Sequence, residues 1–469
     1  MATRVAGSNR GGALERRFRV AERGSNVRTE VVAGVTTFLT MAYILFVNPA
    51  ILGGEGGLAF PQVLTVTALV AGVMTIAMGL VANYPFAIAS GLGLNAVVAF
   101  QLVGAQGLTY PEAMGVVVTE GLIITVLVLT GFREAVLNAI PLALKKAIGA
   151  GIGLFITIIG FATSGLSVPG PGSPLLLRGD VDSARIVVFI VGLLLTALLV
   201  ARRLKGALLV GIVATTVLAV VVNAVSGGQL WTDVGPGVAK VPTDIVALPD
   251  FSLLGQFSFG YVAKIGALGA LLAVFTLMLA DFFDTMGTAI ALGNEAGFLD
   301  ERERLPGANR VLLVDSVAAA AGGVASASSA TTYIESASGI AAGGRTGLAN
   351  LVTGGLFLLA LFLSPLAGVI PPEATAPALV LVGFFMLSVT RELDWDDPSV
   401  AIPAFLTMVT MPFTYSITDG IGAGFVSYTV IKLASGRARD VHWMMALASA
   451  AFAAYFAVAP ISRLLGVGG

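Results

Sequence analysis

The chain has 469 residues, of which 57% are hydrophobic and only 11% are charged, with a mean hydropathy of +0.94. This composition excludes an ordinary water-soluble globular protein and indicates a polytopic, all-α membrane protein. The formal net charge of −1 excludes no class of partner. The absence of cysteine excludes disulfides, thiolate metal sites and cysteine nucleophiles, and the single histidine, His442, argues against a histidine-built metal centre.

Arginine is concentrated at the N-terminus. Residues 1–30 carry seven arginines, and the next basic residue is Arg133. Basic residues next to a first apolar segment favour the cytoplasmic side of a membrane. No apolar stretch with a small-residue cleavage site follows them at the distance typical of a signal peptide. We therefore expect residues 1–30 to be a cytoplasmic tail.

Apolar runs separated by glycine, proline and charged residues predict the membrane-spanning segments. Most runs are close to the ~20 residues that a spanning helix needs, but the third and tenth are short, interrupted and rich in Gly, Ser and Ala. Basic residues mostly fall in loops that alternation places inside; Arg178, Arg185, Lys240 and Lys264 do not. We predict about fourteen spans, with the last run either a further crossing or an interfacial helix. The runs are 31–52, 62–83, 87–103, 113–132, 141–164, 184–202, 206–224, 264–290, 309–324, 327–343, 346–368, 374–390, 399–417, 418–434 and 441–459.

A polar connection, residues 226–260, divides the spans into seven and the remainder. The interrupted third and tenth segments are seven spans apart, and the fifth and twelfth segments each start with or follow an Ile-Pro pair, at Ile140-Pro141 and Ile370-Pro371. An odd offset inverts the topology of the second half. Paired interrupted segments in two inverted halves are a pointer to a transporter's binding site. We predict a 7+7 inverted repeat with broken half-helices in segments 3 and 10.

Two acids, Asp281 and Asp284, lie in the apolar run of the eighth segment. Acids at membrane depth are costly and by default mark a site or pathway. Being three residues apart, the two carboxylates should share a helix face, with Thr285 on an adjoining position. Together with Glu335 in a poorly hydrated cavity, one of these acids can hold a proton. Asp281, Asp284 and Glu335 are therefore candidate proton-coupling residues.

The interrupted segments bring further polar groups. Asn95 and Glu335 stand near the predicted half-helix starts, where free backbone N–H groups carry a partial positive charge. An amide and a carboxylate together can donate to and accept from a flat polar heterocycle. Phe283 and Tyr333, with Phe282, are candidates to offer a ring face to an aromatic ligand.

Each of these residues also has a structural interpretation. Intramembrane acids can cap a broken helix or bind a neighbour, and Asp281 fits this alternative as well as it fits a functional role. Glu120 on the fourth segment has ordinary apolar neighbours, which favours a structural role. Phenylalanines such as Phe283 are more often packing residues. The glycines between Gly149 and Gly153 favour close helix contact rather than a nucleotide loop, because no strand precedes them.

Several motifs together resemble those of the AzgA-like purine permeases, which are related to the uracil and the xanthine/uric acid permeases. The similarity extends from about Thr29 to Arg439. The motifs are Gly91-Leu92-Gly93-Leu94-Asn95-Ala96, Arg133-Glu134-Ala135, Asn138-Ala139-Ile140-Pro141, Gly151-Ile152-Gly153-Leu154-Phe155-Ile156, Asp281-Phe282-Phe283-Asp284-Thr285-Met286-Gly287-Thr288 and Thr331-Thr332-Tyr333-Ile334-Glu335-Ser336.

The resemblance implies a proton-coupled nucleobase symporter with fourteen spans in two inverted repeats. It implies a core domain of segments 1–4 (31–135) and 8–11 (261–370). It also implies a gate domain made of segments 5–7 (136–225) and 12–14 (371–469, including the C-terminal hydrophobic stretch). Residues 226–260 are expected to form an extracellular or periplasmic loop. The resemblance further implies an elevator-like movement of the core against the gate and a homodimer.

Asn95, Asp284 and Glu335 match the family's polar positions. The uracil permeases place one acid and a histidine on the eighth segment, whereas this chain has two aspartates and no histidine there. Alignment on Gly287 favours Asp284 over Asp281 as the proton carrier, and leaves both as candidates.

The sequence thus predicts a multi-pass H⁺/purine symporter of the cell membrane that imports guanine, hypoxanthine or adenine, and it does not separate these three. Membrane lipid and a second copy are expected partners; a metal, a cofactor and nucleic acid are not. The main rival is an inorganic-anion carrier of the same architecture, against which the clustered carboxylates count. A passive channel and an intramembrane hydrolase with paired aspartates are further alternatives. Two acids on one helix do not bracket a scissile bond, so we expect no enzyme.

Overall fold

The computed structural model describes residues 13–130, 139–169, 176–231, 239–240, 244–300, 305–367 and 369–465. Side chains are described in these ranges except at 13, 54–56, 169, 176–177, 283, 286–287, 367 and 458–465. Three parts of the sequence analysis lie outside the described residues. They are the Arg133-Glu134-Ala135 motif, Asn138 at the start of the adjoining motif, and residues 1–12 of the predicted tail.

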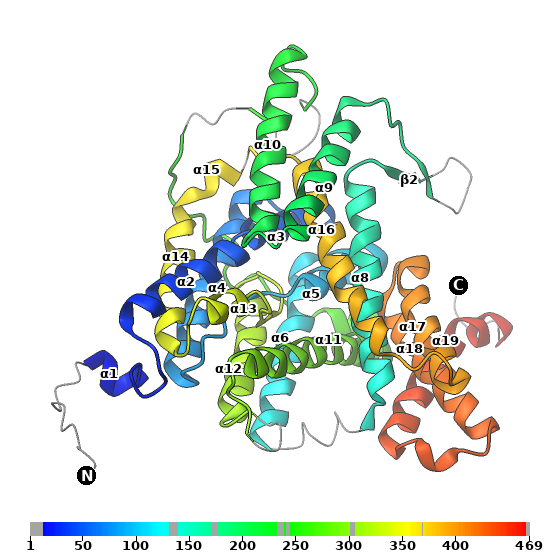
Figure 1. The fold of residues 1–469 in the computed structure, drawn as a ribbon. Coiled ribbons are helices and arrows are strands. Elements are labelled where there is room, and N and C mark those ends of the chain that lie inside the picture. Colours follow the sequence, from blue (N-terminus) through cyan, green and yellow to red (C-terminus); the bar gives the residue numbers. More distant parts are fainter. Residues whose placement is uncertain are drawn as a thin grey trace, which may run out of the picture.

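Helices make up most of the described chain (Figure 1). In the first half the elements are α1 (Ala13–Phe18), α2 (Val27–Met41), α3 (Ile44–Gly56), α4 (Phe60–Val81), β1 (Ile88–Ser90), α5 (Leu92–Ala96), the π-helix η1 (Val97–Ala105), α6 (Tyr110–Leu129), α8 (Leu142–Thr163), β2 (Ser167–Pro169), β3 (Leu176–Arg178), α9 (Ala184–Ala201) and α10 (Ala207–Val225).

The second half begins after the 226–260 connection. Its elements are α11 (Tyr261–Glu295), α12 (Ala308–Val324), β4 (Ala330–Thr332), α13 (Ser336–Ala341), α14 (Gly347–Ala360), η2 (Leu361–Leu363), α15 (Ser364–Ala367), α16 (Pro372–Leu387), η3 (Ser388–Glu392), α17 (Pro398–Thr414), α18 (Ile417–Ala434), η4 (Ala438–Asp440) and α19 (Trp443–Leu465), where η2, η3 and η4 are 3₁₀ turns.

Nine helices among the described residues are long and apolar enough to cross a membrane. The prediction of a mostly helical protein with many spans is confirmed at this level. The count of fourteen, the inverted repeat and the broken half-helices remain predictions. The last apolar run, 441–459, forms the greater part of α19, which packs against α18 through a contact between the hydroxyls of Ser449 and Thr429 at 2.7 Å.

The two short segments contain strands that the sequence interpretation did not foresee. β1 and β4 pair antiparallel, with Ala89 opposite Thr331, and each is followed by a short helix. Small residues such as Ala89 and Ser90 let the extended backbones approach one another. Each strand satisfies the other's N–H and C=O groups, which is required of extended chain buried in a membrane protein. The pairing joins segments that are far apart in the sequence.

The helices pack in two sets (Figure 1). In one set α4 lies on α14 and α12, α2 on α14 and α13, and α6 on α12 and α11. In the other set α8 lies on α16 and α17, α9 on α10 and α16, and α17 on α18. Helices from both halves of the chain contribute to each set.

Glycines allow the closest of these contacts. A Cβ atom on Gly347 of α14 would lie 2.0 Å from the carbonyl oxygen of Gly79 on α4. On α16, a Cβ on Gly383 would lie 2.4 Å from the carbonyl oxygen of Gly153 on α8. Small residues at such crossings let helix backbones approach and pack in a membrane. Part of the glycine-rich run on α8 thus has the close-contact role expected of it, although Gly149 has no described atom within 4 Å of its Cβ position.

Two predicted surface segments are docked on the protein where they are described. In the 226–260 connection, Trp231 is buried and donates its indole N–H to Glu373 Oε2 at 2.9 Å, while Glu373 Oε1 pairs with Arg185 Nε at 2.6 Å. In the predicted tail, Phe18 is buried and Arg23 donates to the carbonyl oxygen of Asn83 at 2.6 Å. The first spanning helix starts at residue 27, before the predicted 31.

Candidate functional site

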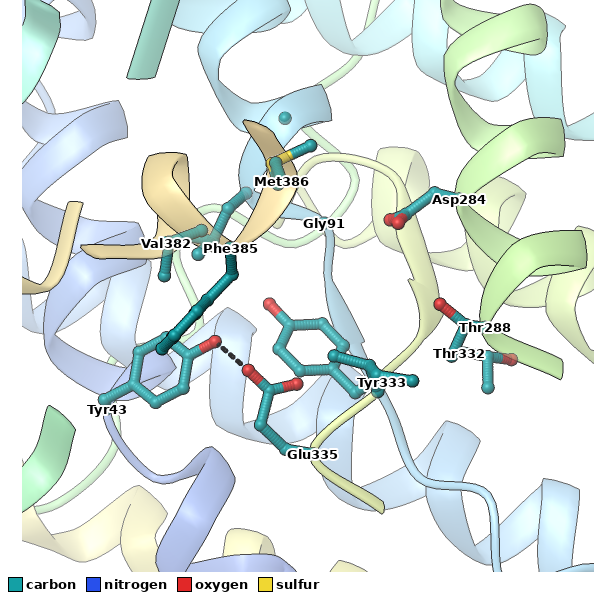
Figure 2. Close-up of a pocket in the computed structure, with 13 residues that line it drawn as sticks. Tyr43, Gly91, Asp284, Thr288, Thr332, Tyr333, Glu335, Val382, Phe385 and Met386 are labelled. Carbon is teal, nitrogen blue, oxygen red and sulfur yellow. Dashed lines mark hydrogen bonds between the residues drawn. The ribbon is translucent and has the colours of Figure 1, made fainter. Parts of the chain in front are cut away.

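A small cavity of about 110 Å³ lies where the two strand-to-helix connections meet α11, α16 and the junction of α2 with α3 (Figure 2). Figure 2 shows Tyr43 and Glu335 on one side of it and Asp284 on the other. The cavity is lined by Tyr43, Gly91, Leu92, Gly93, Asp284, Thr288, Thr332, Tyr333, Ile334, Glu335, Val382, Phe385 and Met386.

The β1–β4 pair builds the walls of the cavity. Tyr333, directly after β4, donates its backbone N–H to Ala87 at 2.9 Å, and Gly91, directly after β1, donates to Ser329 at 2.9 Å. These bonds extend the ladder at both ends, so the chain turns into α5 on one side and towards α13 on the other. The first N–H groups of a helix have no intrahelical partner. The Gly91 N–H is used in the ladder, so the donors at this helix start that line the cavity and can meet a ligand are the backbone N–H groups of Leu92 and Gly93.

Glu335 is the acid on the α13 side of the cavity. Its Oε1 accepts a hydrogen bond from the Tyr43 hydroxyl at 2.6 Å, and its carbonyl oxygen accepts one from Thr40 Oγ1 at 3.3 Å. Both donors come from the first spanning segment, but the Thr40 hydroxyl also has a nearer acceptor in the Thr37 carbonyl oxygen at 2.9 Å. The contact that holds the carboxylate is therefore the one from Tyr43.

The two aspartates of α11 have different surroundings. Asp284 and Thr288 line the cavity, whereas Asp281 and Thr285 are buried and do not. At 3.6 residues per turn, positions three apart differ by about 60° around the helix, while positions four apart differ by about 40°. Asp284 and Thr288 therefore point to nearly the same side of the helix, and so do Asp281 and Thr285. Of the two acids that were expected to share a helix face, only Asp284 is among the lining residues of the cavity.

Thr285 belongs to a buried polar network behind the cavity wall. Its hydroxyl donates to Asp315 Oδ2 at 2.6 Å and lies 2.7 Å from Thr331 Oγ1. Asp315 Oδ1 accepts from the backbone N–H of Thr332 at 2.9 Å and from its hydroxyl at 2.8 Å. Asp315, on α12, therefore ties α11 to β4. The candidate ligand Thr285 is placed on this network and not on the cavity.

The aromatic lining differs in part from the prediction. Tyr333 lines the cavity, and its hydroxyl donates to the carbonyl oxygen of Ser90. The side chain of Phe283, the other predicted ring, lies outside the described residues. A second ring comes from Phe385 on α16, with Val382 and Met386 beside it. The cavity thus joins one helix set to the other.

Asn95 lies on α5, two residues beyond the lining glycines, and is not itself among the lining residues. Its side chain is fully buried, and neither its oxygen nor its nitrogen has a hydrogen-bond partner among the described residues. A buried amide without partners costs free energy, so such a group is a feature to explain. The structure places it adjacent to the site but shows no contact with it.

Glu120 is fully buried on α6, where its Oε2 accepts a hydrogen bond from Ser329 at 3.4 Å. Ser329 directly precedes β4, so this acid supports the strand pair from outside the cavity. Among the described residues, no group of three or more His, Asp or Glu side chains could hold a metal ion.

Sequence reasoning missed Tyr43, Asp315 and the α16 residues. Asp315 could have been found, because it is an acid inside a predicted span and meets the criterion applied to Asp284. Tyr43 could not have been found in this way, because it is an uncharged aromatic residue within an apolar segment. Phe385 and its neighbours on α16 likewise look like ordinary membrane-facing residues until the two helix sets are packed.

Comparison with known proteins adds a family match. The model of the Permease family matches residues 28–422. The chain is 42% identical over 450 residues to the adenine permease AdeQ of Escherichia coli, covering 95% of this chain and 96% of that protein. It is 41% identical over 448 residues to the guanine/hypoxanthine permease PbuG of Bacillus subtilis, covering 94% and 98%.

Among solved structures, the chain is similar to the transmembrane domain of the bicarbonate transporter BicA of a cyanobacterium. The TM-score is 0.61, with 15% sequence identity, and the match covers 85% of this chain and 97% of that one. At this identity the likeness concerns the fold alone.

Proposed function

We propose that this chain, which belongs to the Permease family, is a secondary active transporter that imports the purine nucleobases adenine, guanine or hypoxanthine. The observation that carries the proposal is the small cavity with a carboxylate on each side, Asp284 and Glu335, and aromatic rings between the helix sets. Relatives of nearly the same length are named as adenine and guanine/hypoxanthine permeases, which supports the choice of substrate class.

The lining offers the groups that a purine needs. The carboxylates of Glu335 and Asp284 can accept hydrogen bonds from ring or exocyclic N–H groups, and the backbone N–H groups near Gly93 can donate to a ring nitrogen or carbonyl. Tyr333 and Phe385 provide ring faces, and an aromatic contact adds about 0.5–1.5 kcal/mol beyond area burial. Asn95, whose fully buried amide has no hydrogen-bond partner among the described residues, is the further polar group that we assign to the site.

We also propose transport by an elevator-like movement, which the same arrangement supports. The site residues come from the helix set of segments 1–4 and 8–11, the proposed core (31–135 and 261–370). Only α16 belongs to the other set, the proposed gate (136–225 and 371–469). Sliding the core past α16 would carry a bound base from one side of the membrane to the other. We extend the proposal to fourteen spans as a 7+7 inverted repeat, with broken half-helices in segments 3 and 10.

The surroundings of the protein complete the proposal. We place it in the cell membrane as a homodimer surrounded by lipid, with the arginine-rich residues 1–30 in the cytoplasm and the 226–260 loop outside. The positive-inside rule supports this orientation.

An inorganic-anion carrier is the alternative, because the fold is shared with a bicarbonate transporter. An anion would enter a cavity that already holds the carboxylates of Asp284 and Glu335. Like charges at this depth repel, so these acids count against it.

Uptake measured by competition tests the substrate class. In cells that lack their own purine permeases, the chain is expected to accumulate radiolabelled hypoxanthine. Unlabelled adenine, guanine or hypoxanthine should compete, and sulfate or bicarbonate should not. Competition by the inorganic anions alone would instead establish the alternative function.

Proton coupling has its own test, since a protonophore should prevent accumulation. We propose Asp284 as the proton carrier, because it faces the cavity and Asp281 does not. Asp284→Asn, which cannot exchange a proton, is expected to lose concentrative uptake and its dependence on external pH.

Asp281→Asn is the matched control for this variant, since it makes the same change three residues away on the same helix. It is expected to keep protonophore-sensitive accumulation. The reverse result for the two variants would identify Asp281 as the proton carrier. Accumulation that persists in the presence of a protonophore would contradict proton coupling altogether.

A further inference from the structure

Tyr43 is buried at the junction of α2 and α3, 1% exposed, with its hydroxyl in the cavity. The hydroxyl donates to Glu335 Oε1 at 2.6 Å (Figure 2). A hydrogen bond from a hydroxyl to a carboxylate at this distance is of the charge-assisted kind, which is about twice as strong as a neutral one. Tyr43 is therefore in a position to fix the carboxylate.

The backbone of Glu335 is fixed by the start of α13, where its carbonyl oxygen accepts from the Ser338 N–H at 3.0 Å. Thr40 Oγ1, one turn before Tyr43, lies 3.3 Å from the same oxygen, but its single proton is shared with the nearer carbonyl oxygen of Thr37 at 2.9 Å. Tyr43 is therefore the donor that acts on the end of the Glu335 side chain.

The second carboxylate oxygen of Glu335, Oε2, is the one that a ligand can use. Oε1 already accepts from the protein, and no hydrogen bond from the described side chains to Oε2 is found. A planar heterocycle with a ring N–H can donate to Oε2 in the plane of the carboxylate, as hydrogen bonds to sp² oxygens prefer. Phe385 lines the same cavity from α16, on the gate side (Figure 2).

We propose that Tyr43 is a positioning residue of the site, which occupies one oxygen of Glu335 so that the other selects ligands by a single, oriented N–H donor. This inference rests on the proposed function. It predicts that Tyr43 contributes to choice among purines, because adenine, guanine and hypoxanthine differ in where their N–H donors lie. Without the hydroxyl, the carboxylate can rotate and accept from donors in other positions.

The test is the variant Tyr43→Phe, which removes one oxygen atom and keeps the ring. We expect the KM for the best purine to rise about 10-fold to 100-fold, as loss of one hydrogen bond to a charged group implies. The maximal rate should stay within about twofold of the parent if only binding geometry is changed. The ratio of KM values for adenine and hypoxanthine should move towards one.

Tyr110→Phe is the matched control. Tyr110 is also buried, and its hydroxyl donates to the carbonyl oxygen of Ser326 at 2.8 Å, away from the cavity lining. It loses a buried tyrosine hydrogen bond of similar length, made to a neutral carbonyl oxygen in place of a carboxylate. We expect it to keep the parent's KM and purine preference, even where it lowers the amount of folded protein.

The outcomes separate the inference from the function. Absence of purine uptake by the parent chain overturns the proposed function. Uptake by the parent with an unchanged KM and preference in Tyr43→Phe overturns the role of Tyr43 alone. If Tyr43→Phe does not reach the membrane, its Kd values for adenine and hypoxanthine are measured on the purified protein in detergent. A ratio of the two Kd values closer to one than the parent's supports the inference, and a parent-like ratio overturns it.

Discussion

Glu335→Gln is expected to lower purine uptake at least about 100-fold, because the neutral amide keeps only one acceptor oxygen, which cannot serve both the Tyr43 hydroxyl and a ligand N–H. Hydrogen bonds to a charged group contribute about 1.5–3 kcal/mol each, and every 1.4 kcal/mol is a factor of ten. The amide keeps the size of the side chain, so the fold should be retained. Initial rates of radiolabelled hypoxanthine uptake, normalised to the amount of protein in the membrane, measure the effect.

Glu120→Gln makes the same exchange at a buried acid outside the cavity, and it is expected to keep substantial uptake. Its carboxylate has one long hydrogen bond, from Ser329 at 3.4 Å, so less is lost. The stricter variant is Glu335→Ala. If that variant took up hypoxanthine as well as the parent does, the assignment of the site would be wrong.

The fold class and the family could be predicted because both depend on local patterns. Hydropathy runs show the spans, and the resemblance inferred from the motifs around Asp284 and Glu335 is confirmed by the family match and by nearly full-length relatives. The strands β1 and β4 were not predicted. A three-residue strand has no periodicity of its own, and the pairing of Ala89 with Thr331 depends on two segments far apart in the chain.

The sequence nominates three residues that line the cavity, Glu335, Asp284 and Tyr333, because an acid or a polar aromatic residue in an interrupted or acid-bearing span stands out. Their role in binding stays a prediction. The separation of Asp281 from Asp284 depends on the rotation of α11, which is set by packing. The lining residues of α16 could not be inferred, since they meet the site only through contact between the two helix sets.

Asp315→Ala is expected to disrupt the cavity and the fold together. The buried carboxylate accepts hydrogen bonds from the Thr285 hydroxyl and from the N–H and hydroxyl of Thr332. Each donor left without a partner costs about 1–3 kcal/mol, so the three together reach several kcal/mol. Native proteins are stable by only about 5–15 kcal/mol. We expect a lower apparent melting temperature in detergent, less folded protein and no measurable uptake.

Ser316→Ala, at the next residue of α12, is the control for this variant. Ser316 is also buried, but within the described part of the chain its hydroxyl donates only to the carbonyl oxygen of Leu313 in its own helix at 2.9 Å. It is expected to melt close to the parent and to keep uptake. Equal melting temperatures for Asp315→Ala and the parent would contradict the tie between α11 and β4.

Substitutions of Glu335 and of Asp315 should therefore have different effects on the melting temperature and on its response to ligand. Glu335→Gln removes an oxygen that faces the ligand, so the purified protein should melt like the parent but gain no stability when hypoxanthine is added, because a ligand stabilises only the state that binds it. Asp315→Ala removes an acceptor behind the wall, so it should melt lower even without ligand. Asp315→Asn keeps one carbonyl oxygen and should fall between them, with a reduced melting temperature and a residual ligand shift. A parent-like melting temperature with no ligand shift in Asp315→Asn would instead place Asp315 among the residues that contact the substrate.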